Sequence, residues 1–178
     1  MHHPDAKPFL QAVTAAEDIF NSIIAVAAPD MFTCGSKAIL ALKDMDLCPN
    51  SRIWPSIFSG MAVIANRRTP VHWDKGGSIW NSDLLISGGD HRNAEFHIPD
   101  IDVVLSYDPG TGVLLTGSVL AHSVPMTWSG SRLCLAHFMK DAVQNRLGVP
   151  RPSPTNLFHY DRFKSPGYLL RVDGRTVS

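Results

Sequence analysis

The feature that most constrains the fold is a change of pattern after Pro49, where helix-like periodicity gives way to short strand-like runs. Five such runs lie at residues 57–65, 79–86, 102–107, 112–122 and 133–139. Segments rich in Gly, Pro, Asp and Ser separate them, which is typical of strands joined by turns. Because no helical segment lies between the runs, a doubly wound parallel sheet is disfavoured. A barrel or sandwich with helices outside it is favoured.

The chain before Pro49 predicts the outer helices. From Pro8 to Ala28, apolar residues recur at three- and four-residue spacing, and Pro29 is expected to end this helix. Ser36 to Met45 predicts a shorter second helix, with Ser36 as its N-cap. A third short helix is predicted from Lys140 to Leu147, before a glycine.

These elements predict an α+β protein that forms a single domain over residues 1–178. The expected parts are a helical region at about 8–45, a β core at about 53–148 and a loop-rich tail at 149–178. A composition of 44% hydrophobic and 18% charged residues is typical of a globular protein rather than a disordered one.

The sequence also bears on location. No apolar run is expected to span a bilayer, and the apolar stretch 19–28 follows Glu17 and Asp18 rather than a basic region, so no signal peptide is expected. Three scattered cysteines form neither a disulfide framework nor a zinc pattern. We expect a nuclear or cytoplasmic protein without a membrane partner, and the oligomeric state stays open.

The net charge of zero is unevenly distributed. Residues 130–178 hold eight Lys and Arg against three Asp and Glu, whereas residues 1–129 hold eight against thirteen. A basic final third favours a polyanionic partner such as nucleic acid. Scattered arginines in a solvated tail would give the same count.

A His-x-Asp motif is the first indication of chemistry. Two imidazoles and one carboxylate on one face form the usual site for non-haem Fe(II), with open positions for co-substrate and oxygen. On a strand, residues i and i+2 point to the same side, so His72 and Asp74 would supply two of these ligands together. Of the two other His-x-Asp motifs, one lies ahead of the first helix, where a rigid site is hard to build. The other lies near the C-terminus, and no histidine follows it to complete the set.

An arginine completes the pattern. The co-substrate 2-oxoglutarate binds iron through one end and leaves a carboxylate at the other, which the bidentate fork of an arginine suits. Of the eight histidines, only His122 has an arginine ten residues later, at Arg132. The ordered set predicts His72, Asp74 and His122 as iron ligands and Arg132 as the anchor of 2-oxoglutarate.

At these residues the sequence resembles a known family. The stretches 69–77 (TPVHWDKGG), 107–124 (YDPGTGVLLTGSVLAHSV) and 128–138 (WSGSRLCLAHF) look like the core of 2-oxoglutarate dioxygenases, and more narrowly like the TET/JBP-like branch expanded in basidiomycete fungi. The resemblance covers roughly residues 53–148. It implies a double-stranded β-helix of the jelly-roll or cupin type. It also implies Fe(II), 2-oxoglutarate and O2, and oxidation of methyl groups on 5-methylcytosine or N6-methyladenine in DNA.

Further candidate contacts flank the motif. Asn66 would hydrogen-bond the co-substrate or cap a loop. Arginines beside the site would contact phosphates, a tryptophan would stack on an extruded base, and a glycine pair would let a ligand approach the backbone. The same residue types also suit solvated turns and core positions. The candidate substrate contacts are Arg67, Arg68, Trp73, Gly76, Gly77, His91 and Arg92.

Two other functions fit part of this pattern. A hydroxylase of a small molecule or a protein would use the same four residues and differ only in its pocket walls. A non-catalytic cupin-like binding protein would more often carry His-x-His, and it would not need Arg132.

Overall fold

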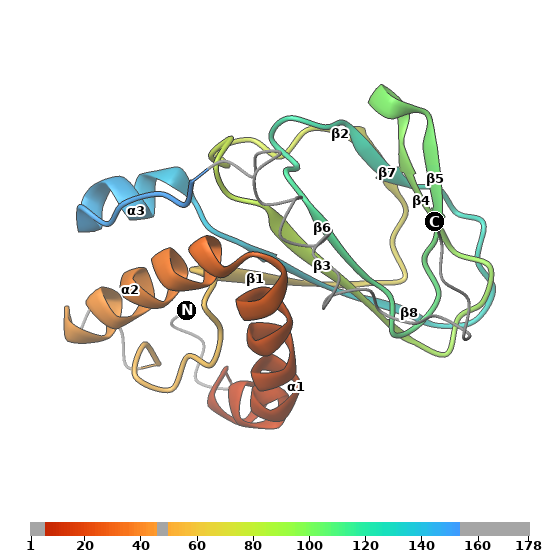
Figure 1. The fold of residues 1–178 in the computed structure, drawn as a ribbon. Helices are drawn as coiled ribbons and strands as arrows, with labels where there is room; N and C mark the ends of the chain where they lie inside the picture. The colour runs from red at the N-terminus through yellow and green to blue at the C-terminus, as the bar shows by residue number, and fades with distance from the viewer. Residues whose placement is uncertain (1–5, 46–49, 154–178) are drawn as a thin grey trace, which may run out of the picture.

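The computed structural model describes residues 6–45 and 50–153, and its first two elements are helices (Figure 1). Helix α1 spans Ala6–Ala27, as predicted, and α2 spans Pro29–Asp44. The expected start of the second helix at Ser36 is wrong. Ala28 interrupts the helical path for one residue, and Pro29 opens α2 because the first turn has no use for the N–H that proline lacks.

Within the described residues eight strands follow, in two antiparallel sheets of four. One sheet has the order β1-β8-β3-β6 and the other β2-β7-β4-β5. The mixed helical and antiparallel architecture expected from the sequence is therefore confirmed. The strands are β1 (Gly60–Ala65), β2 (Thr69–His72), β3 (Asp83–Gly89), β4 (Glu95–Ile98), β5 (Val103–Ser106), β6 (Gly112–Leu115), β7 (His122–Val124) and β8 (Arg132–Phe138).

The strand boundaries correct two expectations. The run 112–122 is not one strand, because β6 ends at Leu115 and a turn leads to β7. His122 therefore opens a strand, whereas the sequence suggested that it ends one. Strands β2, β4 and β7 are only three or four residues long, too short to show a clear alternation of apolar and polar residues.

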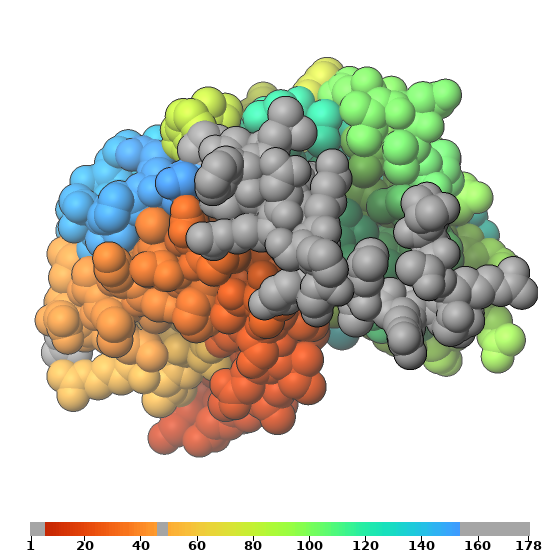
Figure 2. Space-filling model, viewed as in Figure 1, coloured from red at the N-terminus to blue at the C-terminus, as the bar shows by residue number. Residues whose placement is uncertain are grey.

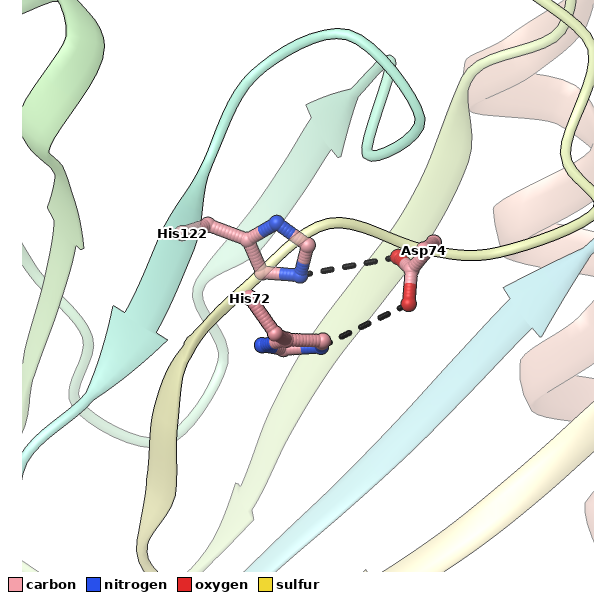
Figure 3. A group of neighbouring side chains, drawn as sticks. All are labelled: His72, Asp74 and His122. Carbon is pink, nitrogen blue, oxygen red and sulfur yellow. Dashed lines mark ion pairs between the residues drawn. The ribbon is translucent and has the colours of Figure 1, made fainter.

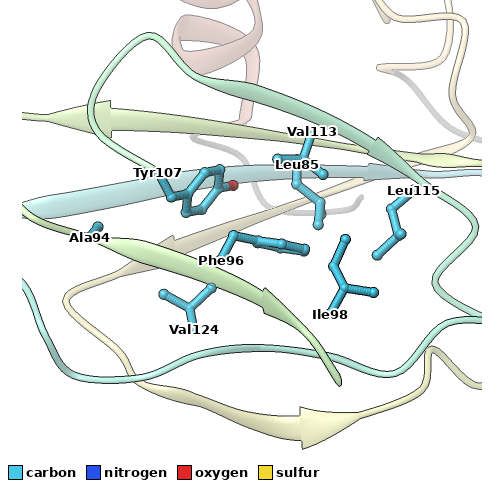
Figure 4. Packing of buried hydrophobic residues seen from close by; sticks show 8 residues of the cluster. All are labelled: Leu85, Ala94, Phe96, Ile98, Tyr107, Val113, Leu115 and Val124. Carbon is cyan, nitrogen blue, oxygen red and sulfur yellow. The ribbon is translucent and has the colours of Figure 1, made fainter. Parts of the chain in front are cut away.

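The main core lies between the two sheets. Apolar side chains from β3 and β6 of one sheet meet those from β4 and β7 of the other, as Figure 4 shows. Burial alternates along β6, where Val113 and Leu115 point inward, as a strand covered on one face requires. The buried members are Leu85, Ala94, Phe96, Ile98, Tyr107, Val113, Leu115 and Val124.

The helices cover the outer face of the β1-β8-β3-β6 sheet (Figure 1). Ile24 of α1 and Met31 of α2 pack with Phe58 and with Leu84 of β3 in a second buried cluster. The short helix α3 (Asp141–Leu147) follows β8 and lies beside α2 (Figure 2). The third predicted helix is thus confirmed.

Helix α1 is long and apolar enough, by length and composition, to cross a membrane, which the sequence analysis did not expect. This is weak evidence for a membrane span, since a helix that packs on a protein core passes the same test. One face of α1 does pack in this way, because Leu10, Glu17 and Ile24 are completely buried.

A buried polar contact joins α1 to the sheet. Glu17 lies 2.6 Å from Nε2 of His137 in β8, and both side chains are fully buried. The other ring nitrogen of His137 donates to the backbone oxygen of Leu84 at 3.1 Å. The rings of Phe20 and Phe58 enclose the imidazole, with centroids 5.8 and 5.6 Å away. Because the surroundings are apolar, removal of one partner would leave the other buried without a hydrogen-bond partner and would lower the stability of the protein.

We expect Glu17→Ala to lower the free energy of unfolding by about 3 kcal/mol, because it leaves a buried imidazole N–H or lone pair without a partner. Denaturant unfolding followed by circular dichroism measures the change. The matched control is Asp18→Ala, an exposed acidic neighbour on the same helix, which should change stability by no more than about 0.5 kcal/mol. Equal effects of the two substitutions would contradict this role of Glu17.

Candidate metal centre

Three side chains that could ligate a metal converge where β2 and β7 pair. His72 is the last residue of β2 and lies opposite His122, the first residue of β7. Asp74 follows two residues after His72 and turns toward both imidazoles (Figure 3). Its two carboxylate oxygens lie 3.5 Å from Nε2 of His72 and 3.5 Å from Nε2 of His122. One ligand atom from each residue lies within 4.8 Å of the others.

The two separations of 3.5 Å suit ligands of a single ion. Ligand atoms held about 2.1 Å from one metal lie roughly 3 to 4 Å apart. The remote ring nitrogens are already engaged, since Nδ1 of His72 donates to the Pro70 oxygen at 2.9 Å and Nδ1 of His122 donates to the Leu120 oxygen at 3.2 Å. This arrangement leaves both Nε2 lone pairs facing Asp74, as metal-binding histidines require. Burial lowers the pKa of His122, which favours the neutral, ligating form.

Gly117 provides the room beside these ligands. A Cβ at this position would collide with a carboxylate oxygen of Asp74 and would lie 3.1 Å from Cε1 of His122. The backbone oxygen of Gly117 also accepts a hydrogen bond from the N–H of Asp74 at 2.8 Å, so the turn before β7 holds the ligand loop. Gly117 could not be predicted from the sequence, because a lone glycine in a turn carries no signal of what approaches it.

A second carboxyl group lies next to Asp74. Asp83, the first residue of β3, is 7% exposed. Burial, and then the nearby charge of Asp74, raise the pKa of Asp83 to about 7. Lys140 partly offsets this effect. The sequence analysis did not identify Asp83, since its nearness to Asp74 comes from strand packing and not from spacing along the chain.

Arg132, the first residue of β8, is buried with 2% of its surface exposed. Its guanidinium carbon lies 5.0 Å from the ring centroid of Tyr107 and 5.3 Å from that of Trp128. Among the described residues, Nε and Nη1 have no hydrogen-bond partner. A buried cation with unsatisfied N–H groups is costly unless an anion binds it. The chemistry of this donor set fits a carboxylate.

A cavity of about 220 Å³ connects the metal-ligand group to Arg132. His72, Asp74 and His122 line it together with Arg132, so the structure brings the four predicted residues into one space. Apolar side chains from β3, β4 and β7 form part of the wall: Leu85, Phe96 and Val124. Phe96 stacks on His122 with a ring separation of 5.6 Å and an angle of 11°.

The other predicted contacts divide into two groups. Arg67 and Gly77 line the cavity. Asn66, Arg68, Trp73, Gly76 and Arg92 do not line it and are exposed at the surface. Trp73 is 54% exposed, because it lies between two ligands in sequence and alternation turns its side chain the other way.

His91 also lies outside the cavity lining. It is 1% exposed, and its Nε2 lies 3.0 Å from the backbone oxygen of Tyr107 and 3.2 Å from Oγ of Ser87. The structure thus places His91 in the interior, bonded to Tyr107 and Ser87, whereas the sequence placed it among the candidate substrate contacts. The burial of His91 results from tertiary packing, so no pattern in the neighbouring sequence could predict it.

Comparisons with known proteins indicate the family and the fold. The family model Tet_JBP, the oxygenase domain of the 2OGFeDO superfamily, matches residues 2–141. The fold is similar to that of a solved structure described as NgTET1 in complex with 5mC DNA, with a TM-score of 0.60 and 15% sequence identity. That match covers 90% of this chain and 60% of the NgTET1 chain. No curated protein matches the chain.

We expect Gly117→Ala to abolish binding of a divalent metal while the protein remains folded, because the added methyl group would occupy space beside Asp74 and His122. Titration with Mn(II) or anaerobic Fe(II) measures binding, and circular dichroism checks the fold. Gly88→Ala is the matched control, since a Cβ there meets nothing within 4 Å. Metal binding by the Gly117 variant at wild-type affinity would contradict the assignment of this site.

Proposed function

The chain belongs to the Tet_JBP family of 2OGFeDO oxygenase domains and is therefore a 2-oxoglutarate- and iron-dependent dioxygenase, and from this premise we propose that it oxidises methyl groups on bases of DNA. The resemblance seen in the sequence is confirmed at the level of the family. The observation that carries the proposal is a His-Asp-His group in one cavity with a buried arginine whose guanidinium lacks partners.

In the proposed site, His72, Asp74 and His122 hold Fe(II). Three protein ligands leave the remaining positions of the ion open to 2-oxoglutarate and O2. When bound, this group supplies the oxidation of an unreactive C–H bond, coupled to conversion of 2-oxoglutarate to succinate and CO2. The chain positions these partners, and its apolar wall of Leu85, Phe96 and Val124 keeps water from one side of the cavity.

Arg132 would bind the distal carboxylate of 2-oxoglutarate. Its buried Nε and Nη1 groups lack acceptors, which a carboxylate would supply, and burial strengthens the attraction because water does not screen it. Tyr107 and Trp128 restrict the guanidinium from its sides. This placement would set the angle at which the other end of 2-oxoglutarate reaches the metal.

We further propose that the two sheets form a double-stranded β-helix. Each sheet has four antiparallel strands, they enclose one apolar core, and the ligands lie at paired ends of β2 and β7. Such a jelly-roll arrangement holds side chains from distant parts of the chain on a rigid frame.

The proposed substrate is 5-methylcytosine or N6-methyladenine in DNA. The structurally similar NgTET1 was solved with 5mC DNA, and Arg67 lines the cavity beside the metal group. The adjacent Arg68 is exposed, so the two arginines could contact phosphates while a base enters the cavity. A base within a duplex would have to be extruded, at a cost of a few kcal/mol.

We expect Arg132→Ala to weaken binding of 2-oxoglutarate by about 2–3 kcal/mol, because the distal carboxylate loses a charge-assisted pair. Calorimetric titration of the Mn(II)-loaded protein measures this affinity. Arg132→Lys should restore only part of it, since an ammonium group is a point charge without the planar fork. Unchanged affinity in the alanine variant would exclude Arg132 as the anchor.

The substrate is tested by succinate release and by mass spectrometry of methylated oligonucleotides. We expect oxidised 5-methylcytosine or demethylated N6-methyladenine only when Fe(II), 2-oxoglutarate and O2 are all present. Binding of DNA should weaken steeply with salt, because each phosphate contact releases counterions. The double variant Arg67→Ala, Arg68→Ala should reduce this dependence without loss of metal. If free metabolites stimulate succinate release and methylated oligonucleotides do not, the protein is a small-molecule hydroxylase instead.

A further inference from the structure

Asn66 lies at the point where β1 ends and pairs with the start of β8. The antiparallel register of these strands places Ala65 opposite Leu133, and one step further it places Asn66 opposite Arg132. The backbone N–H of Asn66 donates to the backbone oxygen of Arg132 at 2.8 Å. In return, the backbone N–H of Arg132 donates to the side-chain oxygen Oδ1 of Asn66 at 2.7 Å. The two residues therefore form a closed pair of hydrogen bonds.

This pair differs from an ordinary rung of the sheet in one respect. In a regular antiparallel pair, both residues exchange backbone N–H and C=O groups. Asn66 has φ of +48°, which turns its backbone out of the strand path, and the side-chain oxygen takes the place of the missing carbonyl. The chain can thus leave β1 at this residue while the last bond to Arg132 is kept.

Few residues can fill this position. Left-handed backbone is costly for most side chains, but asparagine, aspartate and glycine tolerate it. Glycine has no side-chain acceptor. Asparagine and aspartate alone combine the backbone conformation with an oxygen at the right place to receive the N–H of Arg132.

We propose that Asn66 is a positioning residue for 2-oxoglutarate. Asn66 fixes the backbone of Arg132, and through Arg132 it orients the co-substrate without contacting the co-substrate itself. This proposal rests on the function proposed above, in which Arg132 binds the distal carboxylate. Arg132 is the first residue of β8, and it directly follows a turn in which Gly130 has φ of +86°. Its guanidinium is held by ring contacts with Tyr107 and Trp128 and lacks partners at Nε and Nη1 among the described residues. The direction of the side chain therefore depends on how firmly its backbone is fixed.

On the side of β3, the hydrogen bonds next to Arg132 are made by the preceding residue, Ser131. On β3, Gly89 lies opposite Arg132, and the neighbouring Asp90 exchanges two hydrogen bonds with Ser131. Those bonds fix the turn before β8, whereas Asn66 bonds to Arg132 itself. Asp90 therefore shapes the turn before β8, whereas Asn66 orients Arg132.

The test uses Asn66→Gly, which keeps the backbone conformation and the N–H bond and removes only the acceptor. We expect Mn(II)-loaded Asn66→Gly to bind 2-oxoglutarate on the order of 5- to 10-fold more weakly, the loss expected from one hydrogen bond. In turnover, the KM for 2-oxoglutarate should rise by a similar factor while kcat at saturation stays near the wild-type value. Asn66→Asp, which restores an acceptor oxygen, should bind within about twofold of the wild type.

The matched control is Asn93→Gly. Asn93 is also exposed and left-handed, with φ of +63°, but its backbone oxygen accepts a hydrogen bond from Thr127 and not from Arg132. This substitution should leave 2-oxoglutarate affinity unchanged. Within an Arg132→Ala background, Asn66→Gly should cause no further loss, because a residue that acts through Arg132 has no effect without it. Arg67→Ala tests the neighbouring side chain, and an equal loss there would instead assign the effect to Arg67.

The outcomes separate this proposal from the proposed function. If the wild-type protein does not bind 2-oxoglutarate, the function is wrong and the role of Asn66 is wrong with it. If the wild type binds it and Asn66→Gly binds equally well, only the role of Asn66 is overturned. Should Asn66→Gly fail to fold, Asn66→Ala replaces it, because alanine also lacks a side-chain acceptor and adopts left-handed backbone at a modest cost. Wild-type affinity in Asn66→Ala would then overturn the proposal.

Discussion

The pairing of β2 with β7 is the contact on which the site depends. These strands are four and three residues long, and their register shifts between Thr69 and His72 before His72 comes to lie opposite His122. Two imidazoles are thereby held with ring centroids 4.3 Å apart, close enough for one carboxylate to meet both. A different register would send one histidine to the other face of its strand, because side chains alternate with a period of two. Stacking of Phe96 on His122 helps to hold the arrangement from the core side.

Strand β8 links the site to the rest of the molecule. It begins with the buried Arg132 in the cavity, and His137 near its other end binds Glu17 of α1. The strand pairs with both β1 and β3, so it lies within the sheet and not at an edge. The helices thus support the cavity indirectly, because they cover the sheet that holds Arg132 (Figure 1). Rigid support of this kind is what a site needs when a small displacement would misdirect its ligand.

Burial gives Arg132 and Asp83 their properties. An arginine with unpaired N–H groups in a cavity is unfavourable by itself and becomes favourable when a carboxylate binds. Asp83 shares the same cavity, and burial beside Asp74 raises its pKa to about 7. Polar groups that are left strained or unpaired in an otherwise well-packed protein are typical of functional sites. In this chain both groups lie at the first residue of a strand, where side chains project from the end of the sheet.

The sequence by itself identified four candidate residues and predicted the chemistry of the site. The residue types, the i and i+2 spacing of His72 and Asp74 and the ten-residue offset from His122 to Arg132 are local facts, and they sufficed to bring the four residues together as candidates. Tertiary structure decided what surrounds them. That Asn66 pairs with Arg132, that Gly117 makes room beside Asp74 and that His91 lies behind Tyr107 all depend on contacts between segments far apart in the chain. The reason is physical: ligand chemistry and alternation are properties of a few neighbouring residues, whereas register and burial arise only when distant strands pack against each other.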